Sequence, residues 1–91
     1  KYFAIKFSTI HEFGHYFDRF KGFVSQSYDF QQIYNQDDRE FCNHVGIAIN
    51  TTSSEEFFAE SFAAYVNKRE ELKEHCPDTY NYMKVLFDKY I

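Results

Sequence analysis

The chain has 91 residues, which is enough for one small domain or for a piece of a larger one. Its net charge of −4, with no cluster of Lys and Arg, argues against nucleic acid as the main partner. No apolar run approaches the roughly 20 residues that a helix needs to span a bilayer, so we expect no membrane span.

The first predicted helix covers residues 2–20. Its apolar positions recur at spacings of three, four and seven residues, as one face of a helix requires, and they are Phe3, Phe7, Ile10, Phe17 and Phe20. Gly22 is expected to cap the end of this helix. Gly14 lies inside it, where glycine costs about 1 kcal/mol relative to alanine. This glycine either allows another element or a substrate to approach closely, or is a tolerated surface residue.

The same helix contains the pentapeptide His11-Glu12-Phe13-Gly14-His15, an HExxH pattern. Residues four apart share one face of a helix, so both imidazoles can reach one ion. The pattern is typical of zinc metallopeptidases, in which a carboxylate accepts a proton from the water on the metal. We therefore predict one Zn²⁺ per chain, with His11 and His15 as ligands and Glu12 as the general base.

Residues 23–50 give weaker signals. Ser27 is expected to cap a short helix that runs through Tyr34, and the charged residues 37–40 are expected to form a solvated turn. Residues 46–49 are predicted to be a short extended piece. The two cysteines, Cys42 and Cys76, could form one disulfide or remain two buried thiols.

Residues 52–68 give a second strong helical pattern. Thr52 and Glu55 fit a capping box, which leaves Glu56 available for another role. The apolar stripe of this helix consists of Phe58, Phe62, Tyr65 and Val66. Pro77 suits the first turn of a third helix, whose buried edge is predicted to be Tyr80, Met83, Phe87 and Tyr90. We expect a mainly α fold with three principal helices plus a short one.

A catalytic zinc site usually takes three protein ligands, so the HExxH pattern needs a third. His44 is expected in a loop, and His75 is expected to favour the carboxyl end of a preceding helix, so both are weaker candidates. Glu56 and Glu60 share a helix face, and the small residues beside them would let two helices approach closely; these are Ala59, Ala63 and Ala64. We predict Glu56 as the ligand and Glu60 as the acceptor of a ligating histidine's free N–H. The alternative is a solvated acidic face.

The motif HEFGH, followed after 40 residues by Glu56-Phe57-Phe58-Ala59-Glu60-Ser61-Phe62, resembles the catalytic domain of the anthrax lethal factor family of secreted zinc peptidases. The Pro-Pro endopeptidases are related. The likeness continues through Cys76-Pro77-Asp78-Thr79-Tyr80 and so covers nearly the whole chain. It implies a gluzincin-type zincin-like fold, with His11, His15 and Glu56 as zinc ligands and Glu12 as the general base. It also implies a protein or peptide substrate and a secreted, toxin-like protein.

The chain departs from the family pattern in two ways. The family places a tyrosine seven residues before the glutamate ligand, where this chain has Ile49, and Tyr28 or Tyr34 could replace it from another direction. Zincins also carry a β-sheet ahead of the HExxH helix, whose edge pairs with the substrate, and this chain starts ten residues before the motif. We therefore expect residues 1–91 to be a single domain, the C-terminal zinc-binding part of a larger metallopeptidase catalytic domain.

These features predict a zinc-dependent endopeptidase domain that hydrolyses peptide bonds. The alternative is a non-catalytic or degenerate zinc-binding domain of the same fold that serves in structure or protein binding. A helical interaction module without metal is a third possibility. Zinc content separates the third from the other two, and peptide cleavage by the full-length protein separates the first from the second.

Overall fold

The computed structural model describes residues 2–45 and 53–90, with side chains from residue 10 onward. The elements of this part of the chain are the helices α1 (Tyr2–Phe20), α2 (Tyr28–His44), α3 (Ser54–Asn67), α4 (Arg69–His75) and α5 (Pro77–Tyr90), with a 3-10 turn, η1 (Val24–Gln26), between α1 and α2. The described residues contain no strand, which confirms a mainly α fold. None of these helices is both long enough and apolar enough to cross a membrane.

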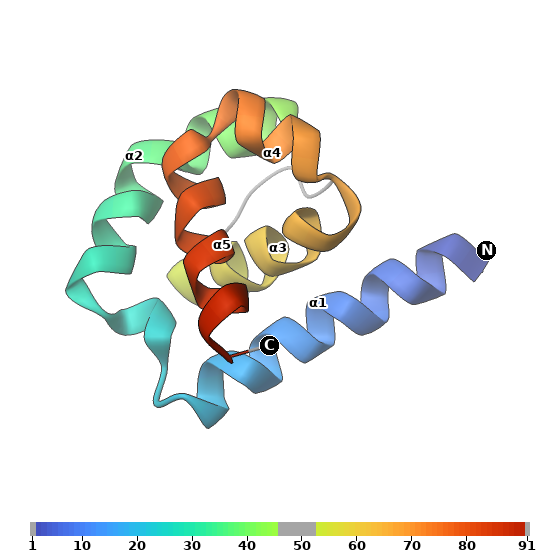
Figure 1. Cartoon of the computed structure of the whole chain (residues 1–91), viewed down its shortest axis with the longest axis horizontal. Helices are drawn as coiled ribbons and strands as arrows, with labels where there is room; N and C mark the ends of the chain where they lie inside the picture. The colour runs from blue at the N-terminus through green and yellow to red at the C-terminus, as the bar shows by residue number, and fades with distance from the viewer. Residues whose placement is uncertain (1, 46–52, 91) are drawn as a thin grey trace.

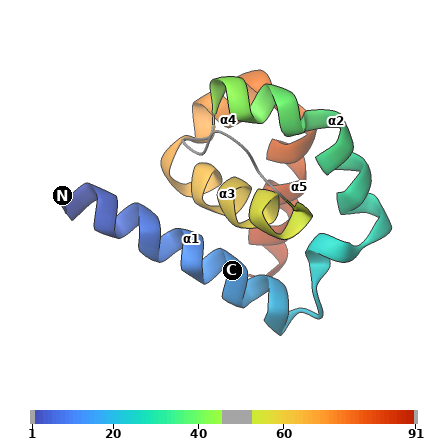
Figure 2. The ribbon, with the colours of Figure 1, turned by 180° about the vertical axis from the view of Figure 1, so that it is seen from behind.

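Helix α3 lies at the centre of the molecule, between α1 on one side and α2, α4 and α5 on the other (Figures 1 and 2). Nearly every side chain of α3 from Phe57 to Tyr65 is buried, including Phe57, Phe58 and Ala63, which are fully buried. A helix that is apolar on all faces is stable only when other elements surround it. The core therefore forms around α3, with Phe30, Phe41, Leu72 and Met83 contributed by α2, α4 and α5.

Helices α1 and α3 pack closely because small residues face each other. Gly14 is buried, and a β-carbon added to it would lie 3.1 Å from the Cα of Ala59 and 3.1 Å from the Cβ of Phe62. Such a contact is tighter than nine in ten of those that real β-carbons make. Of the two sequence interpretations of Gly14, close approach of another element is confirmed, and a tolerated surface glycine is wrong.

Helix α2 is longer than predicted, with 17 residues, although Ser27 caps it as expected by accepting a hydrogen bond from the N–H of Phe30. The solvated turn predicted at residues 37–40 is wrong, because these residues lie inside the helix. Asp37 is only 6% exposed, and its Oδ2 accepts hydrogen bonds from the N–H (3.3 Å) and the hydroxyl (2.6 Å) of Thr79. The Asp37 carboxylate, on α2, thus serves as the hydrogen-bond acceptor for donors in the first turn of α5.

Helix α3 begins two residues later than predicted. Ser53 is its N-cap, with an extended backbone and an Oγ that accepts a hydrogen bond from the N–H of Glu56 at 3.3 Å. The capping box of Thr52 and Glu55 is therefore wrong as the start of this helix. Several Ser and Thr residues stand in succession here, so local sequence offers more than one cap. Thr52 itself and the extended piece predicted at residues 46–49 lie outside the described residues.

Among the described side chains of the predicted apolar stripes, most are buried or half-buried, and the exposed ones lie at helix ends. Phe17, Phe58, Phe62, Tyr65 and Met83 are buried as expected. Phe20, Val66 and Tyr90 are exposed, because each lies in the last turn of its helix, where the stripe runs past the core. The side chains of Phe3 and Phe7 lie outside the described residues.

Two predictions about helix ends are confirmed. Gly22 stands two residues after Phe20, the last residue of α1. Its φ of +79° is the left-handed conformation that ends many helices. His75 lies at the carboxyl end of a helix, α4, which precedes Pro77. The described residues thus form four helices of 14 residues or more and a short one, against three plus a short one predicted.

Both cysteines are free thiols, so the disulfide alternative is wrong in this structure. Cys76 is fully buried between α4 and α5, and burial raises the pKa of its thiol to about 12. Cys42 is partly exposed on α2. A buried thiol that stays protonated is inert, so Cys76 serves in packing.

Candidate metal centre

Two histidines of α1 and one glutamate of α3 come together where these helices cross. The Nε2 of His11 lies 3.4 Å from Oε1 of Glu56, and the Nε2 of His15 lies 3.0 Å from Oε2 of the same carboxylate. The three potential ligand atoms lie within 4.8 Å of one another. The imidazole rings stand nearly perpendicular, with their centroids 4.9 Å apart. The structure therefore brings together the three residues that the sequence predicts as ligands.

The donor set and its surroundings suit a divalent ion. Two imidazole nitrogens and one carboxylate oxygen are the ligands of many catalytic zinc sites, in which the fourth position stays open. All three side chains are partly exposed, from 18% for His11 to 43% for Glu56, so a water or a substrate can reach that position. Glu56 also lies in the first turn of α3, where the helix dipole favours a carboxylate.

Glu60, one turn after Glu56, lies behind the cluster. Its Oε2 is 3.0 Å from Nδ1 of His11, and its side chain is only 9% exposed. Its second oxygen, Oε1, is buried without a hydrogen-bond partner in the described part of the chain. A buried carboxylate with so few partners keeps an excess of negative charge, which a cation on the far side of the imidazole would offset.

The charges around His11 change its protonation. The pKa of His11 is raised above its ordinary value of 6.5, chiefly because Glu60 accepts a hydrogen bond from its Nδ1. Partial burial acts in the opposite direction, and the negative charges of Glu60, Glu56 and Glu12 add to the increase. In the metal-free protein these carboxylates therefore favour a proton where a metal ion would otherwise supply the positive charge.

Glu12 and a cavity adjoin this cluster. The cavity has a volume of about 310 Å³ and is lined by Glu12, His15, Tyr16, Asp18, Arg19, Glu55 and Glu56. Its walls are mostly polar or charged, and the Glu12 side chain is exposed. All five predicted site residues, His11, Glu12, His15, Glu56 and Glu60, thus lie at one place, and their roles stay predictions.

The tyrosines suggested as replacements for the one missing at Ile49 do not line this cavity. Tyr28 is 76% exposed at the start of α2, and Tyr34 packs against Phe57, with ring centroids 5.4 Å apart. Ile49 lies outside the described residues. Tyr16 and Arg19 do line the cavity, and neither is among the site residues predicted from sequence. Tyr16 stands four residues after Glu12 and Arg19 four residues after His15, so helical spacing alone places both beside the motif.

The remaining histidines take no part in this cluster. His44 is the last residue of α2, not part of a loop as predicted, and His75 is the last residue of α4. Both lie beside Glu40, at the ends of α2 and α4, helices whose described residues do not pack against α1.

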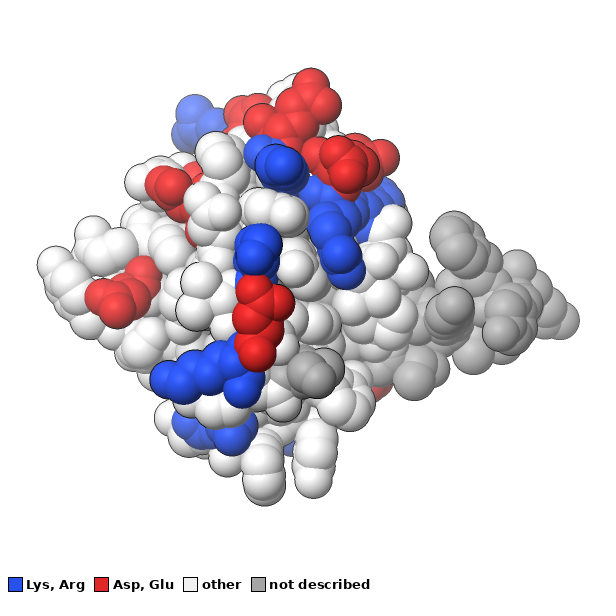
Figure 3. All heavy atoms as spheres, viewed as in Figure 1, with Lys and Arg blue, Asp and Glu red and all other residues white. Residues whose placement is uncertain are grey.

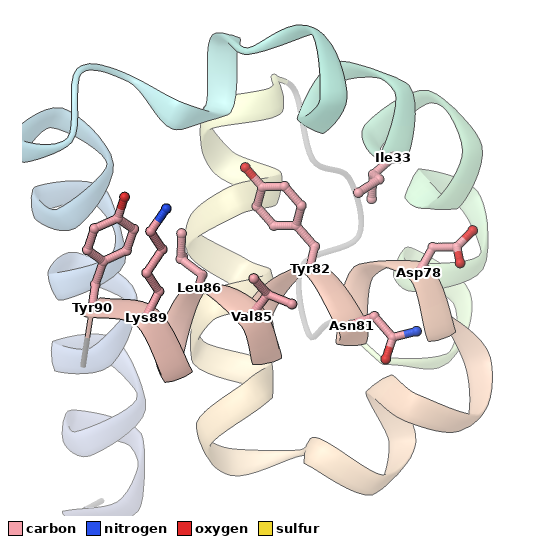
Figure 4. A pocket seen from close by; sticks show the side chains of 8 residues that line it. All are labelled: Ile33, Asp78, Asn81, Tyr82, Val85, Leu86, Lys89 and Tyr90. Atoms are coloured by element: carbon pink, nitrogen blue, oxygen red, sulfur yellow. The ribbon is translucent and has the colours of Figure 1, made fainter.

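A second, apolar hollow lies away from the histidine and glutamate cluster. It has a volume of about 520 Å³ and is lined by Ile33 of α2 and by residues of α5, including Tyr82, Val85 and Leu86 (Figure 4). None of the predicted site residues borders it. On the face shown in Figure 3, Lys and Arg side chains are scattered among Asp and Glu and form no single basic patch.

Comparison with known protein families finds a match over most of the chain. The family described as "Anthrax toxin lethal factor, N- and C-terminal domain" matches residues 4–86. That range contains every residue of the cluster, the whole of α3 and the whole of α4. No curated protein sequence matches the chain.

Proposed function

The chain belongs to the anthrax toxin lethal factor family, and from this membership we propose that it is the zinc-binding part of a secreted zinc-dependent endopeptidase. The observation that carries the proposal is the convergence of His11, His15 and Glu56 from two helices. The polar cavity beside Glu12 supports it further, because a hydrolase needs room for water and a substrate next to its base.

His11, His15 and Glu56 would hold the zinc. Glu60 orients His11 by accepting the proton of Nδ1, which fixes the tautomer and leaves Nε2 free to bind metal. The short distance between α1 and α3 at Gly14 keeps the two sides of the ligand set in register. When bound, zinc supplies a Lewis acid that polarises the scissile carbonyl and lowers the pKa of its water to about 7.

Glu12 performs the proton transfers. Its carboxylate accepts a proton from the attacking water and then delivers that proton to the nitrogen of the leaving amine. The exposed position of Glu12 at the cavity is suited to both steps, because the carboxylate must meet water first and the substrate nitrogen afterwards. The substrate class that the family membership supports is a peptide or protein.

Zinc analysis and peptide hydrolysis test this proposal. Protein purified without added metal is expected to contain one tightly bound zinc per chain, and Glu56→Ala is expected to lose it while circular dichroism still shows a helical protein. Glu71→Ala, an exposed carboxylate on α4, is the matched control and should keep the metal. Zinc retained by Glu56→Ala but lost by His44→Ala would contradict the ligand assignment.

A non-catalytic zinc domain is the second candidate function. It is favoured by the absence of Tyr28 and Tyr34 from the cavity, since neither can supply the oxyanion donor expected of the family from there. Full-length protein that binds zinc through His11, His15 and Glu56 but cleaves no peptide in a diverse library would support this candidate over the first.

A further inference from the structure

A second group of potential metal ligands lies where the ends of α2 and α4 meet. Glu40 and His44 stand four residues apart on α2 and so share a face, and His75 ends α4. The Nδ1 of His75 lies 3.2 Å from Oε2 of Glu40, and the Nε2 of His44 lies 3.6 Å from the same oxygen. One carboxylate oxygen therefore faces a nitrogen from each of two imidazoles on two helices.

The pairing of the histidines distinguishes this group from an ordinary acidic surface. The chain has four histidines, and the structure divides them into two pairs, each with a glutamate. The potential ligand atoms of the second group also lie within 4.8 Å of one another. Two nitrogens and one carboxylate oxygen suit zinc, cobalt, nickel or copper, whereas calcium and magnesium prefer oxygen ligands alone.

We propose that Glu40, His44 and His75 bind a second divalent transition-metal ion. The two imidazole rings are stacked, with centroids 4.4 Å apart and planes 5° from parallel, so their nitrogen lone pairs lie in two nearly parallel planes and cannot meet at one ion. One ring must therefore turn to reach the ion together with the other. The His44 side chain is 48% exposed and has room to turn.

Exposure sets the character of this site. Glu40 and His44 are each 48% exposed and His75 is 28% exposed, so water completes the coordination and the ion exchanges freely with solvent. A ring that must reorient on binding also reduces affinity. The second ion therefore binds more weakly than the first, and it links the end of α2 to the end of α4, which stabilises the folded chain.

Calorimetric titration of the metal-depleted full chain with Zn²⁺ tests the proposal. The wild-type chain is expected to bind two ions with different affinities. His44→Ala and His75→Ala should each lose the weaker binding event and keep the tighter one, and His15→Ala should show the reverse. Glu74→Ala, which removes an exposed carboxylate next to His75 but outside the group, is the matched control and should still bind two ions.

A second measurement uses His15→Ala as the background, because only the weaker site remains there. Zn²⁺ should raise the thermal unfolding midpoint of this variant, and the further substitution His75→Ala should abolish that shift. A weak event that persists unchanged in both His44→Ala and His75→Ala would overturn the second site, as would a wild-type chain that binds only one ion. A His15→Ala chain that keeps the tight event would instead contradict the ligands proposed for the first cluster, without bearing on the second.

Discussion

Gly14 of α1 lies directly against Ala59 of α3, so close that a β-carbon at Gly14 would be 3.1 Å from the Ala59 Cα. These residues stand between the two parts of the candidate zinc site, because Gly14 is inside the HExxH pattern and Ala59 lies between Glu56 and Glu60. The separation of the helices therefore also sets the separation of the predicted metal ligands.

Gly14→Ala tests this relationship. The added methyl group must push α1 from α3, and we expect the overpacking to exceed the gain of about 1 kcal/mol in helix propensity and to destabilise the fold by about 1–3 kcal/mol. Zinc affinity should fall too, because His11 and His15 would move away from Glu56. Urea unfolding of the metal-free chain and zinc titration measure the two effects.

Gly22→Ala is the control for that experiment. At Gly22 the φ of +79° is unfavourable for any residue with a β-carbon. No atom would lie within 4 Å of that β-carbon, so the substitution costs backbone strain and no steric clash. The variant should lose about 1–2 kcal/mol of stability without weakening zinc. Equal zinc affinities for Gly14→Ala and the wild type would show that the close approach does not set the ligand geometry.

Glu60→Ala should reduce zinc affinity by about 10–100-fold, less than the loss of a direct ligand, because it removes the acceptor that orients His11. Competition with a chelator of known affinity measures the change. The variant also removes a buried carboxylate, so unfolding of the metal-free chain must be recorded beside it. If the affinity is unchanged, Glu60 has a packing role alone.

Glu12→Gln should keep the zinc and abolish peptide hydrolysis, since an amide of the same size cannot accept the proton. Zinc content and cleavage rate of the full-length protein are the measurements. A Gln variant that retains more than about a few per cent of the rate would exclude Glu12 as the base.

The raised pKa of His11 predicts two effects of pH. Zinc binding needs the neutral imidazole. As the pH is lowered, zinc affinity should therefore begin to fall at a higher pH than it would if His11 had an ordinary pKa. The stability of the metal-free chain should depend on pH in the opposite sense to zinc affinity. A pKa raised on folding gives stability that is fully present below the unfolded value of about 6.5 and is lost as the pH rises through the folded value.

Zinc titrations and urea unfolding across pH 5–9 measure both effects, and Glu60→Ala is the matched variant, because Glu60 is the largest cause of the shift. Both pH dependences should move toward those of an ordinary histidine in this variant. If Glu60→Ala leaves the pH dependence of zinc affinity and of stability unchanged, those dependences do not report the raised pKa of His11.

Asp37→Ala should destabilise the fold by about 1–3 kcal/mol, since it leaves the N–H and the hydroxyl of Thr79 buried without their acceptor. Asn43→Ala, at an exposed position of the same helix, should change stability by less than about 0.5 kcal/mol. Comparable small losses for both variants would mean that Asp37 does not cap α5.

The part of the site that follows helical spacing could be predicted from sequence. His11 and His15 share a face because they are four residues apart, and so do Glu56 and Glu60, whatever the rest of the chain does. The pairing of the two helices could be inferred only through the small residues at their contact. Sequence spacing left Gly14 ambiguous, because nothing local identifies the residue that packs against it.

Features that depend on distant partners could not be predicted. Asp37 stands in a charged run and looked solvated, but its acceptors serve Thr79, which lies 42 residues away along the chain. From sequence, His44 and His75 are only weak candidates for the first site. Their actual relationship is to each other, through the packing of α4 on α2, which no local pattern contains.

The central burial of α3 has a consequence for the rate of metal release. Amide hydrogen exchange should be slowest in α3, which is enclosed by the other helices, and faster in α1, which packs mainly against α3. Glu56 would then stay in place while His11 and His15 leave with α1 during local opening. Zinc would be released at the frequency of that opening, and its dissociation rate should follow the exchange rates of the α1 amides.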